Sequence, residues 1–149
     1  MPVEIVRRAG GRKFSSARLK RVAGAVLQLI GAQEAELSLA LIGNAEMRQL
    51  NAKYRHKDYP TDVLSFPVAN DLPAGSQLLG DVVISIDKAV EQARERQRTL
   101  DQEVVTLLVH GIVHLLGYDH ERSAKDARIM TRKEKKIARQ LCERGLLKV

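Results

Sequence analysis

The chain has 149 residues, of which 44 % are hydrophobic, so it is long enough for one domain with a packed core. Its single cysteine, Cys142, excludes an intrachain disulfide and a cysteine-rich metal site. The longest apolar run is too short for a membrane span and the first residues lack a signal-peptide pattern, so we expect a cytoplasmic protein without membrane contact. The net charge of +7 is compatible with a polyanionic partner such as nucleic acid.

Strands and helices alternate in the first part of the chain. The apolar spacing predicts, in order, a strand at Val3–Arg8, a helix from Ser15 or Ser16 to about Ile30, a strand at Leu37–Ile42 and a helix from Asn44 to about Arg55. A serine at the start of the first helix can accept hydrogen bonds from its free backbone N–H groups, and Asn44 is predicted to cap the second helix in the same way.

Two further strands and three helices are predicted in the rest of the chain. They are a strand at Val63–Val68, a strand at Leu78–Ile86 after a loop at Asn70–Gln77, a polar helix at about Lys88–Arg98, a histidine-bearing helix that begins after Thr99, and a last helix from Ser123 to about Arg144. Thr99 and Gln102 have the spacing of a capping box for the histidine-bearing helix.

This order of elements indicates an α+β fold in a single domain that spans residues 1–149. We expect a mixed four-stranded sheet covered by about five helices, with the histidine-bearing helix buried in the core. The order of the strands in the sheet is not predicted.

The stretch Val104–His120, VVTLLVHGIVHLLGYDH, contains three of the chain's four histidines. His110 and His114 are four residues apart and therefore lie on one face of a helix, one turn from each other. Gly117 is a natural helix stop that lets the chain return, so that His120 can reach the same ion. Three imidazoles suit zinc and leave a fourth position open, as catalytic sites do.

The same stretch has the ligand spacing of metzincin proteases, H-x-x-x-H-x-x-G-x-x-H. Those enzymes place a glutamate directly after the first histidine as the general base. Here that position is Gly111, which cannot accept a proton. Asp119 or Glu121 could in principle replace this base, but neither occupies its place on the helix, so peptidase activity is not expected.

A second informative stretch runs from Asn51 to Pro67, NAKYRHKDYPTDVLSFP. In it, Arg55 precedes a polar bend, and Thr61 and Asp62 lead into a strand. The guanidinium of an arginine is a planar fork of donors that matches a phosphate group. Taken locally, Arg55 is better explained by a solvated charge at a helix end, and the Thr61–Asp62 pair is explained by turn chemistry.

Three stretches occur in a characteristic order: LNAKYRHKDYPTDVLSFP at Leu50–Pro67, GDVVIS at Gly80–Ser85 and HGIVHLLGYDH at His110–His120. Together they resemble the YbeY family of bacterial metal-dependent endoribonucleases, the ribosomal RNA maturation factors. The resemblance implies that His110, His114 and His120 bind one Zn²⁺ ion per chain and that Arg55 acts beside it. We therefore expect Arg55 and His114 to be catalytic.

The resemblance also implies a process and partners. It implies maturation of the 3′ end of small-subunit ribosomal RNA and ribosome quality control, with ribosomal proteins and a ribosome-associated GTPase as partners. The hypothesis is that a zinc-bound water or hydroxide assists cleavage of single-stranded RNA while Arg55 grips the scissile phosphate. Whether water or the ribose 2′-OH attacks is open. Asp62, Asp81 and His56 are candidates for the general base, although a structural or solvated role suits each of them better.

The last helix is rich in positive charge, at Lys125, Arg128, Arg132, Lys133, Lys135, Lys136 and Arg139. A solvated face is the usual explanation of such a pattern, and contact with RNA phosphates is the functional one. On the second interpretation, Arg132 and Lys136 join Arg55 as substrate-binding residues.

Two other functions are compatible with these residues. One is a zinc hydrolase that acts on a peptide or a small molecule, against which Gly111 counts. The other is a non-catalytic ribosome-assembly factor whose zinc only braces the fold. This second function predicts that replacement of His114 lowers stability, whereas replacement of Arg55 has no effect on function.

Overall fold

The structure, a computed structural model, describes residues 3–9, 15–67, 78–117 and 123–147. Its elements are β1 (Val3–Arg7), α1 (Ser16–Leu29), β2 (Glu36–Ile42), α2 (Asn44–Arg55), β3 (Val63–Pro67), β4 (Leu78–Ser85), α3 (Ile86–Glu95), α4 (Leu100–Leu115) and α5 (Ala124–Glu143). Five helices and four strands within these residues confirm the predicted α+β class. The predicted loop at Asn70–Gln77 lies outside them.

The four strands form one mixed sheet in the order β1-β2-β4-β3. β1 and β2 are parallel, as are β2 and β4, whereas β3 runs antiparallel to β4 and forms one edge of the sheet. Parallel neighbours need a crossover connection, and helix α1 provides the one between β1 and β2. Pro67 is the last residue of this edge strand. Proline has no backbone N–H, and at this position the missing inter-strand hydrogen bond destabilises the sheet least.

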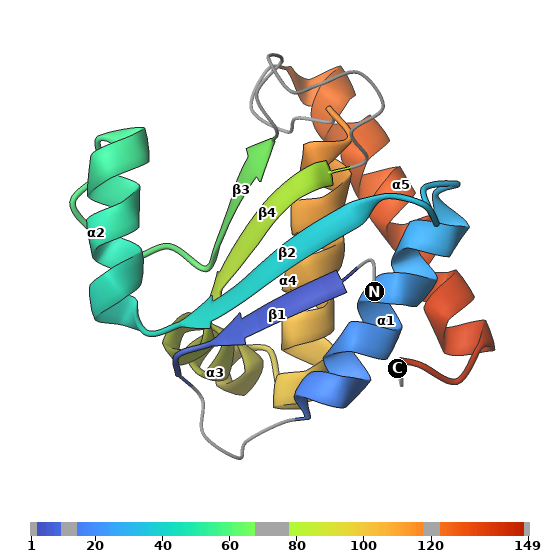
Figure 1. The fold of residues 1–149 in the computed structure, drawn as a ribbon, viewed down its shortest axis with the longest axis horizontal. Coiled ribbons are helices and arrows are strands. Elements are labelled where there is room, and N and C mark those ends of the chain that lie inside the picture. Colours follow the sequence, from blue (N-terminus) through green and yellow to red (C-terminus); the bar gives the residue numbers. More distant parts are fainter. Residues whose placement is uncertain (1–2, 10–14, 68–77, 118–122, 148–149) are drawn as a thin grey trace.

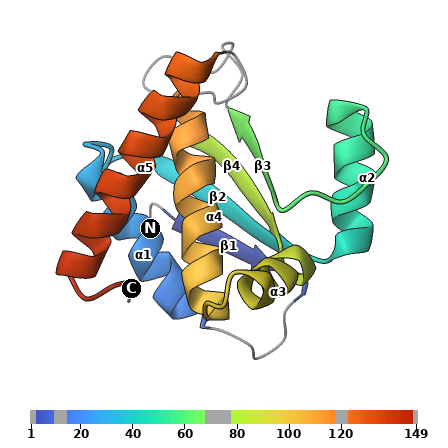
Figure 2. The ribbon, with the colours of Figure 1, turned by 180° about the vertical axis from the view of Figure 1, so that it is seen from behind.

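Helices cover the two faces of the sheet unequally (Figures 1 and 2). Helices α1, α4 and α5 pack together on one face, and α2 stands on the other face near β3. The larger apolar cluster joins α1, α4 and α5 to the sheet through residues such as Leu39, Val82 and Leu108. A smaller cluster of Ile42, Met47, Leu64 and Val83 holds α2 against the opposite face. Strands β3 and β4 therefore lie between α2 and α4.

Two predicted helix starts need correction. Asn44 is the first residue of α2 and Gly43 is its cap; the Asn44 side chain instead accepts a hydrogen bond from the Ser85 hydroxyl at 2.8 Å. Helix α3 begins at Ile86 rather than Lys88, because the Ser85 hydroxyl accepts a hydrogen bond from the backbone N–H of Lys88 and so caps the helix directly after β4.

Helix α4 forms where the sequence places it. Thr99 and Gln102 make both hydrogen bonds of the predicted capping box, and the helix ends at Leu115 shortly before Gly117, whose φ is +99°. Among the described residues, no helix combines the length and apolar character needed to cross a membrane.

Candidate functional site

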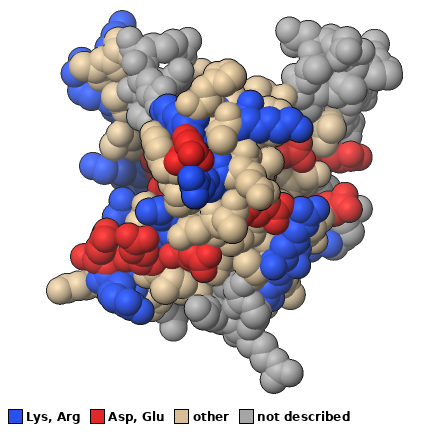
Figure 3. Space-filling model, turned by 90° about the vertical axis from the view of Figure 1, so that its left-hand side faces the viewer, with Lys and Arg blue, Asp and Glu red and all other residues tan. Residues whose placement is uncertain are grey.

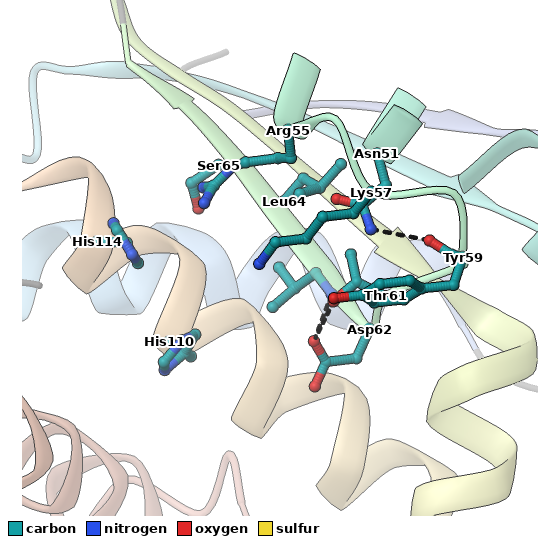
Figure 4. A pocket seen from close by; sticks show the side chains of 11 residues that line it. Asn51, Arg55, Lys57, Tyr59, Thr61, Asp62, Leu64, Ser65, His110 and His114 are labelled. Carbon is teal, nitrogen blue, oxygen red and sulfur yellow. Dashed lines mark hydrogen bonds between the residues drawn. The ribbon is translucent and has the colours of Figure 1, made fainter. Parts of the chain in front are cut away.

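A pocket of about 340 Å³ opens between α2 and α4, across the edge strand β3 (Figure 4). It is lined by Asn51, Arg55, Lys57, Tyr59, Thr61, Asp62, Val63, Leu64, Ser65, His110 and His114. Helix α4 supplies the two histidines, while the end of α2, the following bend and β3 supply the remainder. The two separate stretches singled out in the sequence therefore meet in one cavity.

The two histidines stand on the one face of α4 that is not fully buried. His110 and His114 are half-buried, as are Gln102 and Thr106, which precede them at four-residue intervals. The helix is buried as predicted, but this one face borders the pocket instead of the core. Their ring centroids are 6.0 Å apart with planes at 74°, so both rings project from adjacent turns on the same side.

Gly111 faces the sheet, about 100° around α4 from His110. A Cβ atom at this position would come within 2.7 Å of Val82 Cγ1, closer than carbon atoms can approach. The Ser65 hydroxyl also donates a hydrogen bond to the Gly111 carbonyl at 2.9 Å and ties the helix to β3. A glutamate here would have to enter the packed interface with β4, so the base position of the metzincins does not exist in this fold.

Glu134 of α5 is hydrogen-bonded to His110, with 2.7 Å between Oε1 and the ring Nδ1. This bond is the main cause of a raised His110 pKa, which burial opposes and the negative charges of Glu134 and Asp62 reinforce. In the neutral ring, donation from Nδ1 fixes the tautomer and leaves Nε2 with its lone pair. A carboxylate behind a histidine is the usual outer contact of a metal-binding imidazole.

The opposite wall of the pocket carries positive charge. Arg55 is the last residue of α2, and His56 follows it in the left-handed conformation with φ of 58°, which turns the chain toward the pocket. Figure 4 shows Arg55 and Lys57 extending from this side toward His110 and His114. Asp62 is the one carboxylate among the described residues of the lining, so an anionic ligand would meet two cations and a pair of imidazoles.

The bend between α2 and β3 is held by specific hydrogen bonds. Arg48 binds Asp58 with both arms of its guanidinium, Nε to Oδ1 at 2.7 Å and Nη2 to Oδ2 at 3.0 Å. Asn51, which is only 2 % exposed, donates from Nδ2 to the Tyr59 carbonyl at 2.8 Å. These contacts fix the segment that carries Lys57 and Tyr59.

Of the three predicted candidates for the general base, the structure brings one to the pocket. Asp62 lines it, although its Oδ1 accepts a hydrogen bond from the Val63 N–H at 2.7 Å and its Oδ2 one from Gln92 at 3.2 Å. Asp81 lines a different groove on the far face of the sheet, and His56 is exposed outside the lining. The sequence predicted a structural role for Asp62, and these hydrogen bonds provide one.

The third predicted ligand, His120, lies outside the described residues, as do Asp119 and Glu121. Within the described part of the chain, no group of three potential ligands therefore assembles. The two described histidines fit a zinc ion by their donor chemistry: both are imidazoles on one helix face at a pocket, and one is held by a carboxylate.

The predicted substrate contacts separate into two places. Arg55 lines the pocket, whereas Arg132 and Lys136 line a groove along the exposed side of α5. Sequence reasoning missed Lys57, Tyr59, Ser65 and Glu134. Glu134 gave no signal, because it is one acidic residue in a highly charged helix, 24 positions from its partner. The others belong to the stretch already singled out, where their proximity to Arg55 was the available signal.

The two stretches that form the pocket both lie within a region that is similar to known proteins. The family model described as "Endoribonuclease YbeY" matches residues 5–142. Curated relatives named "Endoribonuclease YbeY" include one from Anaeromyxobacter sp. (strain Fw109-5), 49 % identical over 85 % of this chain and 65 % of its own length. Another, from Aquifex aeolicus, is 48 % identical over 77 % of this chain and 76 % of its own length.

A solved structure shares the fold. The solution structure of TM1509 from Thermotoga maritima has 28 % sequence identity and a TM-score of 0.62, and the match covers 91 % of this chain and 85 % of that one. The match with the Anaeromyxobacter relative spans a little under two thirds of that relative's length. The family match covers all the described pocket residues, and on this basis the chain belongs to the YbeY family.

Proposed function

We propose that this protein is a zinc-dependent endoribonuclease specific for single-stranded RNA, and that it acts in maturation of the 3′ end of small-subunit ribosomal RNA and in ribosome quality control. The relatives' name supports ribonucleolytic cleavage as the activity. The main support from the structure is one juxtaposition: Arg55 of α2 faces His110 and His114 of α4 across a single pocket.

Each part of this pocket has a role that its chemistry supports. His110, His114 and His120 would hold zinc. The ion would act as a Lewis acid and would lower the pKa of a bound water molecule toward neutrality. Glu134 holds His110 in one tautomer and orientation. Arg55 and Lys57 bind the phosphate and neutralise the charge that develops on it during cleavage.

The pocket also favours a single strand over a duplex. Its walls are side chains of α2, β3 and α4, and Lys57 and Tyr59 project from the bend beside it (Figure 4). A flexible strand can turn one phosphate into such a cavity. A duplex is stiff and presents its phosphates on a convex surface, and unpaired strands are the usual targets of proteins that handle RNA in this way.

The test compares two histidine variants. His114→Ala removes a pocket histidine, whereas His56→Asn changes a histidine outside the pocket to a residue that tolerates the left-handed backbone. We expect His114→Ala and chelator-treated wild-type protein to lose cleavage of a labelled single-stranded RNA, and His56→Asn to retain it. Equal cleavage by all samples would show that the activity depends neither on His114 nor on a metal, and would contradict the proposal.

The product ends identify the nucleophile. A 2′,3′-cyclic phosphate would show attack by the ribose 2′-OH, and a 5′-phosphate that incorporates labelled oxygen from solvent would show direct attack by water. Substrates with 2′-deoxyribose at the scissile position provide the control, because they can be cut only in the second case.

The cellular part of the proposal concerns partners. We propose that ribosomal proteins and a ribosome-associated GTPase bring the small ribosomal subunit to the pocket, because the chain has few aromatic residues to read bases on its own. Cells that depend on the Arg55→Ala variant should accumulate small-subunit RNA with an unprocessed 3′ end. Normal 3′ ends in such cells would contradict this role.

A further inference from the structure

A second groove lies between α4 and α5, next to the pocket. It has a volume of about 760 Å³ and is lined by Arg96, Gln97, Arg98, Gln102, Thr106, Ala138, Arg139, Cys142 and Leu147. No carboxylate belongs to this lining among the residues that the structure describes. We call it the α4–α5 groove.

The groove is aligned with the pocket. His110, Thr106 and Gln102 lie on one face of α4 at four-residue intervals, and Glu134, Ala138 and Cys142 do the same on α5. His110 contacts Glu134, and Thr106 and Gln102 share the groove with Ala138 and Cys142. The groove therefore begins one helical turn, about 5.4 Å, from the pocket histidine. The side chains of Ala138 and Cys142 are small, so they leave space in the α4–α5 groove.

Three arginines line the α4–α5 groove, and one buried carboxylate orients two of them. The Glu103 carboxylate, 0 % exposed, lies 2.9 Å from Arg96 Nη1 and 3.2 Å from Arg98 Nε. Arg98 also donates from Nη1 to the Thr106 hydroxyl at 3.2 Å. The side chains of Arg96 and Arg98 remain 48 % and 34 % exposed, so one buried anion orients two guanidiniums that solvent can still reach.

Arg139 is exposed and completes the cluster. With Glu103 counted, the three arginines leave two net positive charges at the groove. Arg139 also lines the separate groove along the exposed side of α5, together with Arg132 and Lys136, so positive charge continues there. The surface on the α2 side of the molecule differs, because Lys and Arg are interspersed with Asp and Glu there (Figure 3).

We propose that the α4–α5 groove is a second binding site for the backbone of the RNA, occupied by phosphates of the strand that leaves the pocket. Guanidiniums match phosphate oxygens in geometry and charge. Pre-orientation by Glu103 reduces the ordering cost of binding. The inference rests on the proposed function. It adds that an RNA must extend beyond the pocket to bind tightly, because a short oligonucleotide cannot occupy both sites.

Cys142 makes the groove accessible to a local measurement, since it is the chain's single cysteine and belongs to the lining. The rate at which a thiol reagent modifies Cys142 is measured with non-cleavable oligonucleotides of about four and about 16 nucleotides. We expect the long oligonucleotide to slow modification and the short one, at the same nucleotide concentration, to leave it unchanged. Binding of the long oligonucleotide without protection of Cys142 would overturn the proposal.

Two charge-neutralising variants supply the second readout. Arg139→Gln removes a groove cation, and Arg21→Gln removes an exposed cation of α1 outside the groove lining. Loss of one phosphate contact lowers the slope of log affinity against log salt by about 0.7 for a single strand. We expect this change for Arg139→Gln with the long oligonucleotide only. The same change in Arg21→Gln, or none in Arg139→Gln, would refute the site.

Failure of this proposal and failure of the proposed function are distinguishable. The groove is tested by binding and by Cys142 protection, which need no catalysis. If the wild-type protein cleaves RNA but the long oligonucleotide does not protect Cys142, only the proposed second binding site is refuted. If the long oligonucleotide protects Cys142 but no RNA is cleaved, the protein binds RNA at the groove and the proposed enzymatic function is refuted.

Discussion

Gly111 determines how close the histidine-bearing helix comes to the sheet. Its missing side chain lets α4 rest on Val82, and its carbonyl accepts the Ser65 hydroxyl bond. The neighbouring residue, His110, is rotated by about 100° around the helix and lines the pocket. Gly111 therefore sets the distance of the helix from the sheet, and His110 presents its imidazole to the pocket at that distance.

Replacement of Gly111 by alanine should destabilise the protein by about 1–3 kcal/mol, because the new methyl group overlaps Val82. Gly24 of α1 is the matched control, since a Cβ there meets nothing within 4 Å. Gly24→Ala should raise stability by about 0.5–1 kcal/mol through helix propensity. Urea unfolding measures both changes. Equal stabilisation by the two substitutions would show that the contact with Val82 is not tight.

Glu134 acts on the site through His110. In the metal-free protein the bond to Glu134 raises the His110 pKa, so it stabilises the fold fully below the unfolded-state pKa of about 6.5 and loses this effect as pH rises through the folded pKa. Glu134→Gln should therefore lower the His110 pKa in an NMR titration, and the stability it costs should be largest at low pH. A cost that grows with rising pH would contradict this assignment.

The same substitution should weaken zinc binding by about 10–100-fold, as loss of an outer carboxylate partner does at other zinc sites. Competition with a chromogenic chelator measures the affinity. Lys133→Gln, a neighbouring change outside the contact with His110, serves as control and should leave the affinity unchanged.

At the level of elements, the site depends on how α2, the bend after it and α4 are placed around β3. The histidine spacing, the capping box and the helix stop at Gly117 were predictable, because each follows from residues within a few positions of one another. The meeting of Arg55 with the histidines was not derivable from local pattern. It depends on the strand order, which places β3 beside β4 and α2 on the far face.

Asn51 shows how an element supports the site without chemistry of its own. Asn51→Ala should cost about 1–3 kcal/mol, since it leaves the Tyr59 carbonyl without its buried partner. It should also reduce RNA cleavage per folded molecule, because Lys57 and Tyr59 lose their fixed positions. Thr99→Ala, which removes a helix cap for about 1 kcal/mol, should leave cleavage per folded molecule unchanged. Equal cleavage per folded molecule by the two variants would show that catalysis does not depend on the position of the bend.

At the level of the whole molecule, the proposed zinc ion would link folding to function. A ligand that binds only the folded state stabilises it, by about 2.7 kcal/mol at a concentration one hundred times its dissociation constant. Zinc should therefore raise the melting temperature of the wild-type protein and of Arg55→Ala, and should do so much less for His114→Ala. A zinc-independent melting temperature in the wild type would exclude the proposed site.

The most direct test of the central claim is single-turnover cleavage of a single-stranded RNA by zinc-loaded Arg55→Ala, beside wild type and Lys53→Ala. Lys53 is an exposed cation two residues from Arg55 and outside the pocket lining. We predict that Arg55→Ala keeps its fold and zinc but cleaves about 10²–10³-fold more slowly, as removal of one charge-stabilising donor does elsewhere. Lys53→Ala should match the wild type. Wild-type rates for folded, zinc-loaded Arg55→Ala would contradict the account, because cleavage would then not depend on this arginine.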